Sequence, residues 1–159
     1  YACSKAVGSL MRYAYDNSCI ELRDKTAETR FCNVFGPRQD KRKIFPAIKE
    51  SLEGNYSIPL HQGGKGYREY IYVKNIPPAI DLILEKGDRT YNLTLNDGYT
   101  VQEIIALSEK VTGKKCLTHP SHREGMDLKY QMDATRIREL GWKPLYTFEE
   151  GLQEYLCKK

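Results

Sequence analysis

The chain has 159 residues, 40% of them apolar, and a formal net charge of +4 at pH 7. This length supports one hydrophobic core but is short for a two-domain enzyme, so we expect one compact unit over residues 1–159. The charge lies in mixed runs with no basic block between aromatic residues, and no apolar stretch is long enough to span a bilayer, which argues against nucleic-acid and membrane partners.

The first two predicted elements are a helix and a strand. Apolar residues at helical spacing, such as Leu10 and Tyr15, predict a helix over residues 1–16 that lacks a start signal. An apolar, β-favouring run over residues 29–34 predicts a strand, and Gly36-Pro37 ends it, as is typical of a strand that leads into a functional loop. A helix followed by a strand indicates part of an α/β unit.

Periodicity and turn residues predict the elements of the remaining chain. They are, in order, a helix over 45–52, strands over 57–60 and 69–73, a helix over 76–85, a strand over 91–95, and helices beginning at 100, 133 and 147. Two capping boxes, Thr100 with Glu103 and Thr147 with Glu150, mark the start of two of these helices. The glycine-rich residues 63–66 are predicted to form a hairpin turn and not a phosphate loop, because no Ser or Thr follows the lysine.

The five cysteines are scattered and odd in number. They form no Cys-x-x-Cys pair, and no histidine lies at metal-ligand spacing from them, so we expect reduced thiols, no metal site and a cytoplasmic protein. These residues are Cys3, Cys19, Cys32, Cys116 and Cys157.

Tyr1 and Lys5 form a possible acid–base pair. They are one helical turn apart, so an ammonium group could stabilise the tyrosine phenolate and lower its pKa from about 10 towards neutrality. A tyrosine tuned in this way can exchange a proton with a hydroxyl group. The same pair occurs in many ordinary helices, so by itself it favours a structural interpretation.

Several motifs in sequence order resemble the extended short-chain dehydrogenase/reductases, above all the nucleotide-sugar dehydratases, decarboxylases and epimerases. Residues 1–5 resemble the family's Tyr-x-x-x-Lys, residues 30–38 its R-x-x-N-V-Y-G-P segment, and residues 66–75 its R-D-Y-x-Y-V-x-D segment. Residues 123–127 are similar to R-P-G-H-D, and residues 133–144 resemble D-x-x-K-x-x-x-x-L-G-W-x-P, in which Trp142 would anchor the core.

The resemblance implies an α/β fold. It would contain the carboxyl-terminal part of a Rossmann-like parallel sheet unit together with a small α/β substrate-binding lobe. Residues 1–42 would end the NAD-binding domain, to which some later segments return, and residues 43–159 would form most of the nucleotide-sugar-binding lobe. No glycine fingerprint follows a strand, so the amino-terminal dinucleotide-binding half is expected to be absent.

The resemblance also implies roles for individual residues. Tyr1 and Lys5 would be catalytic and, with Cys32, would contact NAD, whereas the residues that contact a nucleotide-diphosphate sugar would be Asn33, Lys43, Ile44, Arg68 and Arg123. An arginine suits a diphosphate because its planar fork binds phosphate oxygens bidentately. The alternatives are a solvated basic loop for Lys43 and a cross-strand salt bridge for Arg68.

The chain departs from the family pattern at four positions. Glu69 and Asn75 replace aspartates, Thr94 stands where glycine is usual, and Met126 replaces a histidine. The hydrogen bonds that those aspartates and that histidine make in the family are therefore not expected here.

The implied activity is that of a nucleotide-sugar 4,6-dehydratase of the dTDP-glucose type, an NAD-dependent lyase of carbohydrate biosynthesis, acting as a homodimer through residues 2–16. The alternatives are a UDP-sugar decarboxylase or 4-epimerase of the same family and a non-catalytic nucleotide-sugar-binding module. The family's upstream Ser/Thr and its Asp-Glu pair are missing from this sequence. We therefore expect the chain alone to be inactive.

Overall fold

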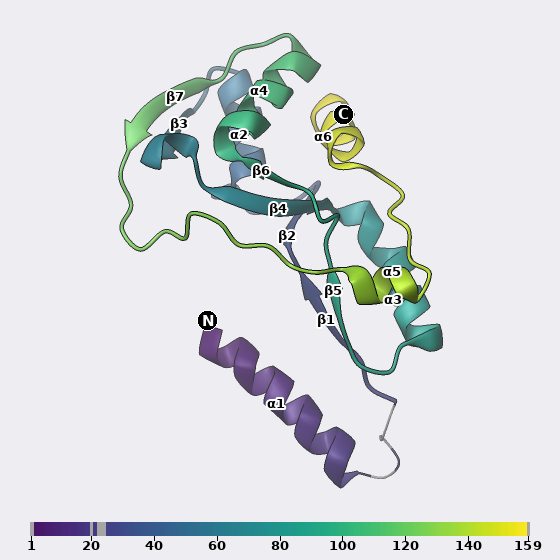
Figure 1. Cartoon of the computed structure of the whole chain (residues 1–159). Helices are drawn as coiled ribbons and strands as arrows, with labels where there is room; N and C mark the ends of the chain where they lie inside the picture. The colour runs from purple at the N-terminus through teal and green to yellow at the C-terminus, as the bar shows by residue number, and fades with distance from the viewer. Residues whose placement is uncertain (1, 20, 22–24, 159) are drawn as a thin grey trace.

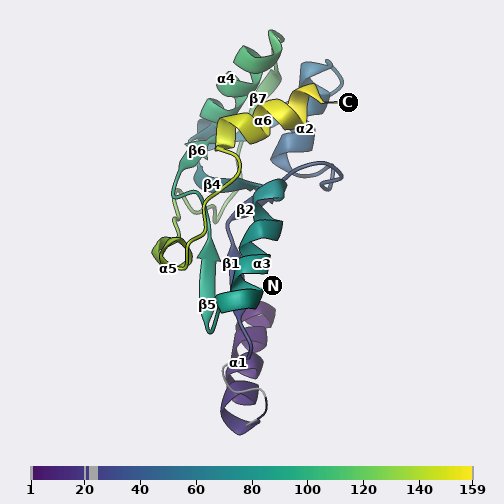
Figure 2. The ribbon, with the colours of Figure 1, turned by 90° about the vertical axis from the view of Figure 1, so that its right-hand side faces the viewer.

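The computed structural model describes residues 2–19, 21 and 25–158 (Figure 1). The molecule is elongated, with α1 at one end and β7 and α4 at the other in both views (Figure 2). The helices are α1 (Ala2–Ser18), α2 (Ile44–Leu52), α3 (Ile76–Lys86), α4 (Val101–Thr112), α5 (Thr135–Glu139) and α6 (Phe148–Cys157). The strands are β1 (Glu28–Phe31), β2 (Asn33–Phe35), β3 (Ser57–His61), β4 (Tyr67–Tyr72), β5 (Thr90–Leu93), β6 (Gly98–Thr100) and β7 (Leu117–Ser121). Within the described ranges, no helix combines the length and the apolar character needed to cross a bilayer.

The strands form three small sheets. β1 pairs in parallel with β5, β2 pairs in parallel with β4, and β3 pairs in parallel with β7. β6 adds to β4 in the antiparallel direction. Helices link the parallel pairs, because a parallel connection must cross back over the sheet. The predicted α/β class is confirmed.

The strand predicted over residues 29–34 is in fact two strands. The backbone bends at Cys32, whose N–H still bonds the Leu93 carbonyl at 3.2 Å, and the next residue, Asn33, pairs with Tyr70. The chain thus passes from the β5 side to the β4 side within one residue. An apolar run alone does not reveal such a bend, since both halves favour β structure.

The hairpin predicted around residues 63–66 is wrong. A short 3-10 turn, Gln62–Gly64, follows β3, and Gly63 and Gly64 both have positive φ, a conformation that glycine adopts without steric cost. β3 and β4 do not pair with each other, because β3 pairs with β7 and β4 lies between β2 and β6. This topology follows from the pairing of β3 with β7, which is distant in the sequence, and no local sequence pattern indicates that pairing.

Two strands were missed, and one helix is shorter than predicted. β6 and β7 lack a clear alternation of apolar residues, and most of β7 is exposed, so its pairing with β3 defines it. The helix predicted from residue 133 spans only Thr135–Glu139, because Asp133 accepts hydrogen bonds from the N–H and hydroxyl groups of Thr135 and lies outside it.

Two hydrophobic clusters support the fold. The first joins α2, α4 and α6 to β4 around a stack of Phe35 on Phe45, whose ring centroids lie 4.2 Å apart. The second joins α3 and α5 to β5 and includes Trp142, 3% exposed, as the sequence predicted. Burial of such large side chains stabilises each cluster by roughly 2 kcal/mol per residue. The clusters fix β4, which carries Arg68 and Tyr70 of the site.

Both predicted capping boxes are present. The hydroxyl of Thr100 accepts the Glu103 N–H at 3.2 Å, and Glu103 accepts the Thr100 N–H at 2.7 Å. Thr147 and Glu150 make the same two bonds at the start of α6. Each box satisfies backbone donors that have no partner within the helix.

Candidate functional site

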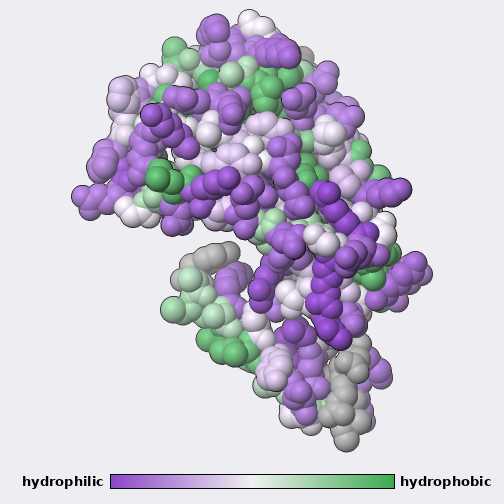
Figure 3. All heavy atoms as spheres, in the orientation of Figure 1, coloured by the Kyte–Doolittle hydropathy of each residue, from purple (hydrophilic) through white to green (hydrophobic). Residues whose placement is uncertain are grey.

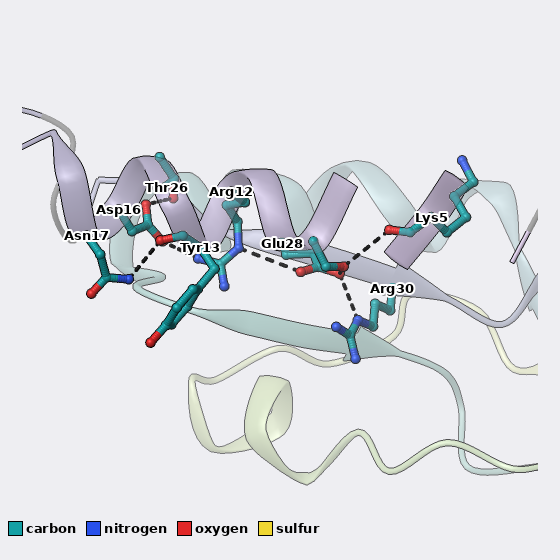
Figure 4. Close-up of polar contacts among 9 residues, drawn as sticks. Lys5, Arg12, Tyr13, Asp16, Asn17, Thr26, Glu28 and Arg30 are labelled. Atoms are coloured by element: carbon teal, nitrogen blue, oxygen red, sulfur yellow. Dashed lines mark hydrogen bonds and ion pairs between the residues drawn. The ribbon is translucent and has the colours of Figure 1, made fainter. Parts of the chain in front are cut away.

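The face of α1 that approaches β1 is polar. Ser9 donates a hydrogen bond to Glu28 at 2.7 Å. Arg12 pairs with the same carboxylate at 3.6 Å, and Arg30 donates to it at 2.8 Å (Figure 4). Burial would raise the pKa of Glu28, but the hydrogen bonds from Arg30 and Ser9 hold it below its usual value. Glu28 therefore stays charged and holds the helix against the strand.

Lys5 and Cys32 line one cavity, between α1 and β1, together with Ser9 and Glu28. In Figure 4 the Lys5 side chain extends away from Glu28 and Arg30. Tyr1, the predicted catalytic partner of Lys5, lies outside the described residues. The structure thus brings together two of the three residues that were predicted to contact the cofactor.

The Cys32 thiol is buried. Burial raises its pKa to about 12, a hydrogen bond with Thr94 opposes this shift, and the nearby Glu69 adds to it. A thiol with such a pKa is a poor nucleophile, because the thiolate is the reactive form. Cys32 therefore contributes the shape of the cavity wall at this position.

A second hollow holds Asn33, Lys43 and Ile44, and a third holds Ile44, Arg68 and Arg123. The two hollows share Ile44 and Tyr70, so they adjoin each other. All five residues predicted to bind substrate thus lie along one surface, although they come from four separate segments.

The Arg68 guanidinium is held by backbone carbonyl groups. It donates to the carbonyl oxygens of Tyr67 at 2.7 Å and of Asp127 at 2.6 Å, and it lies 4.8 Å from the centre of the Tyr130 ring. Within residues 2–19, 21 and 25–158 it forms no ion pair, so the cross-strand salt bridge considered as its alternative role is not seen. Its positive charge remains available to an anion.

Asn33 is oriented by two acceptors. Its side-chain amide donates to the Glu69 carbonyl at 2.9 Å and to the Tyr130 hydroxyl at 3.0 Å. Lys43 precedes α2 as its N-cap residue and is exposed, which is compatible with either of its two predicted roles.

Four residues beside the predicted ones were missed by sequence reasoning. Arg42, Tyr56 and His61 line the hollow that contains Arg68 and Arg123, and Tyr130 contacts both Asn33 and Arg68. Arg42 pairs with Asp40 at 2.7 Å, and this bond holds the pKa of the Asp40 carboxyl well below its usual range. The sequence could have suggested two of them, because Arg42 lies directly before Lys43 and Tyr130 lies shortly after the 123–127 motif. Nothing local in the sequence pointed to Tyr56 or His61.

The departures from the family pattern have structural roles here. The Glu69 carboxyl group is 1% exposed and accepts the Met132 N–H at 2.9 Å. Asn75 is fully buried and makes three hydrogen bonds with the backbone of Leu145 and Tyr146. Met126 lines the hollow beside Arg123, where its thioether adds apolar surface in place of a titratable ring.

Comparison with known proteins agrees with this arrangement. The chain is 34% identical to the low-salt glycan biosynthesis protein Agl12 of Haloferax volcanii, over 96% of this chain and 50% of that protein. It superposes with a TM-score of 0.87 on dTDP-glucose 4,6-dehydratase from Bacillus anthracis in complex with NAD, at 30% identity over 98% of this chain and 50% of that one. The TM-score is 0.88 for UDP-glucose 4-epimerase of Thermus thermophilus in complex with NAD, at 25% identity over 98% and 52%.

The chain spans about half the length of these relatives. The family model described as GDP-mannose 4,6 dehydratase matches residues 1–155. This match covers both hydrophobic clusters and every residue of the candidate site. The chain therefore belongs to the GDP-mannose 4,6-dehydratase family.

Proposed function

We propose that this chain is the substrate-binding half of an NAD-dependent nucleotide-sugar 4,6-dehydratase. The observation that carries the proposal is the convergence of Arg68 and Arg123, from separate segments, on one hollow that adjoins Asn33 and Lys43. Guanidinium groups bind phosphate oxygens through charge and paired hydrogen bonds, so this surface suits a nucleotide diphosphate. The similarity to dTDP-glucose 4,6-dehydratase from Bacillus anthracis supports the same activity.

The residues near α1 fit the reactive end of a nicotinamide cofactor. Lys5 lines the cavity beside β1, where an ammonium group can donate to a ribose hydroxyl, and the protonated Cys32 thiol forms part of the same wall. When bound, NAD would accept a hydride from carbon 4 of the hexose and return it at carbon 6. Relatives of this chain were solved in complex with NAD.

In the proposed reaction Tyr1 takes the proton of the hydroxyl group on carbon 4 while hydride leaves the same carbon. Lys5 lowers the pKa of the Tyr1 phenol by favouring its anionic form. The ketone formed at carbon 4 acidifies the proton on carbon 5, so that proton and the hydroxyl group of carbon 6 leave together as water. Hydride then returns to carbon 6 and a proton is added at carbon 5, which restores a saturated sugar with a ketone at carbon 4. The acid and base for this elimination are not found in this sequence, so the chain alone is expected to be inactive.

The substrate contacts are proposed as follows. Arg68 and Arg123 hold the diphosphate, Lys43 and Ile44 contact the nucleotide, and Asn33 contacts the sugar nucleotide through its side-chain carbonyl oxygen, because its two amide hydrogens are bonded to Glu69 and Tyr130. Holding the diphosphate fixes the hexose near Tyr1, which lowers the entropic part of the barrier. The small positive net charge also favours an anionic ligand.

Products distinguish this activity from its alternatives. The full-length protein would be incubated with dTDP-glucose, UDP-glucose, UDP-N-acetylglucosamine and UDP-glucuronic acid in turn, and the products analysed by mass spectrometry. Loss of one water from one substrate is expected. An unchanged mass with an altered sugar would indicate the 4-epimerase, which the similarity to the Thermus thermophilus enzyme keeps as the second candidate. Loss of carbon dioxide from a UDP-uronic acid would indicate the decarboxylase, and binding without any product the non-catalytic module.

We also propose a cytoplasmic homodimer. Val7, Leu10, Met11 and Tyr15 are each more than half exposed, and Figure 3 shows hydrophobic side chains along α1. Exposed apolar patches of this kind mark association surfaces. The five free cysteines fit a reducing compartment. In the full-length protein, Leu10→Glu should shift the sedimentation coefficient to that of a monomer, whereas an unchanged value would exclude this interface.

A further inference from the structure

Glu69 is a buried acidic residue of the core. Its side chain lies in β4, is 1% exposed, and forms no ion pair within the described part of the chain. Burying a carboxyl group is costly unless hydrogen bonds replace those to water. Glu69 accepts one such bond, from the Met132 N–H at 2.9 Å. An apolar side chain at this position would avoid that cost. We therefore expect the Glu69 carboxyl group to have a role that depends on its hydrogen bond.

Met132 belongs to a segment, residues 127–134, that runs beside β4 and β5. The segment is held by hydrogen bonds at both ends and in its middle. These join Tyr67 N to Leu128 O (2.8 Å), Arg68 to Asp127 O (2.6 Å), Met132 N to Glu69 (2.9 Å), Asn92 to Asp133 O (2.9 Å) and Ala134 N to Asn96 (3.3 Å). Among the residues outside the segment that form these hydrogen bonds, Glu69 is the buried one, so water competes least with the bond that it makes.

The segment presents Tyr130 to the proposed substrate surface. The Tyr130 hydroxyl accepts a hydrogen bond from Asn33 at 3.0 Å, and its ring lies 4.8 Å from the Arg68 guanidinium. The Glu69 carbonyl accepts the second bond of the same Asn33 amide, at 2.9 Å. Glu69 thus acts on Asn33 twice, directly through its main chain and indirectly through the segment that its side chain holds.

We propose that Glu69 is a positioning residue, whose buried side chain fixes residues 127–134 so that Tyr130 orients Asn33 and Arg68 for the nucleotide-diphosphate sugar. The proposal rests on the proposed function of this surface. It explains why a carboxyl group occupies a core position, because a bond to a main-chain N–H fixes a segment in one register in a way that apolar packing does not.

Binding tests the proposal in the full-length protein. Dissociation constants for UDP and dTDP would be measured by calorimetry for the wild type, Glu69→Ala and Glu69→Gln, with thermal unfolding recorded for each. Glu69→Ala should weaken binding by about tenfold, the effect of one lost hydrogen bond to a charged or polar group. Glu69→Gln keeps an acceptor oxygen and should bind within about threefold of the wild type, by the same arithmetic. Glu150→Ala, in the capping box of α6, is the control that lowers stability without affecting affinity, because α6 contributes no residue to either hollow.

Two further measurements keep the result decisive. Amide hydrogen exchange of a peptide covering residues 126–134 should accelerate in Glu69→Ala without ligand, and unchanged exchange would overturn the proposal. Tyr130→Phe combined with Glu69→Ala should weaken binding less than the product of the two single effects, because both act through Asn33. Fully multiplicative effects would also overturn it.

If Glu69→Ala does not fold, Glu69→Asp replaces it, since its shorter side chain should release Met132. A wild type that binds neither nucleotide would remove the proposed function and this proposal together, whereas unchanged exchange with normal binding would remove this proposal alone.

Discussion

Asn75 forms hydrogen bonds in both directions with the backbone of Tyr146. Its Oδ1 accepts the Tyr146 N–H at 2.9 Å, and its Nδ2 donates to the Tyr146 carbonyl at 2.8 Å. The same Oδ1 accepts the Leu145 N–H at 2.8 Å. An amide suits this place because the backbone offers both donors and an acceptor. The clamp ties the start of α3 to the loop before α6, which explains why asparagine replaces the aspartate of the family pattern.

Asn75→Asp should therefore destabilise the protein. The carboxylate cannot donate to the Tyr146 carbonyl, and it would carry a charge into a site that is 0% exposed. We expect a loss of about 1–3 kcal/mol in the free energy of unfolding, measured by urea denaturation at pH 7. The exposed Asn55 supplies the control, since Asn55→Asp should leave the urea midpoint almost unchanged. Equal midpoints for the two variants would contradict the prediction.

Arg68→Lys should weaken nucleotide-diphosphate binding by about tenfold, because an ammonium group cannot reproduce the bidentate fork. The Lys side chain would also lose one of the two carbonyl bonds that orient Arg68. Calorimetric titration of the full-length protein with UDP or dTDP measures the effect. Arg89→Lys, on an exposed residue paired with Asp88, is the matched control. Affinity that is equal in both variants would show that Arg68 does not contact the phosphates.

Glu154 should contribute to stability in a pH-dependent way. The hydrogen bond from Lys74 lowers the pKa of its carboxyl group to about 2, with burial opposing this and Lys158 adding to it. Since this folded-state pKa is depressed, the contribution is present above the unfolded pKa of about 4.3 and is lost as pH falls towards 2.

The Glu154→Gln variant tests this dependence. Its deficit in unfolding free energy relative to wild type should be largest at pH 6 and should shrink steadily as pH falls from 5 towards 2, measured by urea denaturation. Glu85→Gln is the control, because Glu85 is mostly exposed and lies 3.9 Å from Lys86. A deficit for Glu154→Gln that stays constant over this pH range would rule out the ion pair as its cause.

Gly151→Ala should destabilise the packing of α6 on β4. A Cβ at this position would lie 2.6 Å from the Tyr72 Cβ, and that contact forces the helix away from the strand. We expect a loss of about 1–3 kcal/mol, as is usual for overpacking. Gly8→Ala in α1 has no atom within 4 Å and should instead be neutral or stabilise by up to about 1 kcal/mol through helix propensity. Thermal unfolding of both variants gives the comparison, and equal shifts would exclude a steric origin.

Much of the site could be predicted from the sequence because its residues belong to contiguous motifs. Asn33, Lys43, Ile44, Arg68 and Arg123 were all chosen from short segments, and the structure places them along two adjoining hollows. His61 and Tyr56 were missed because each comes from a segment without a recognisable pattern. Their proximity to Arg68 follows from how α2, β3 and β4 pack together.

The sequence by itself determined the local features of this protein: both capping boxes and the helices α2 and α3. These depend on interactions over a few residues, such as the bond between Thr100 and Glu103, so a short window contains their cause. Only the tertiary structure decided that β3 pairs with β7, that the chain changes sheets at Cys32, and that Tyr130 reaches Asn33. Strand pairing and contacts between distant segments depend on which surfaces are buried together, and no local pattern encodes that choice.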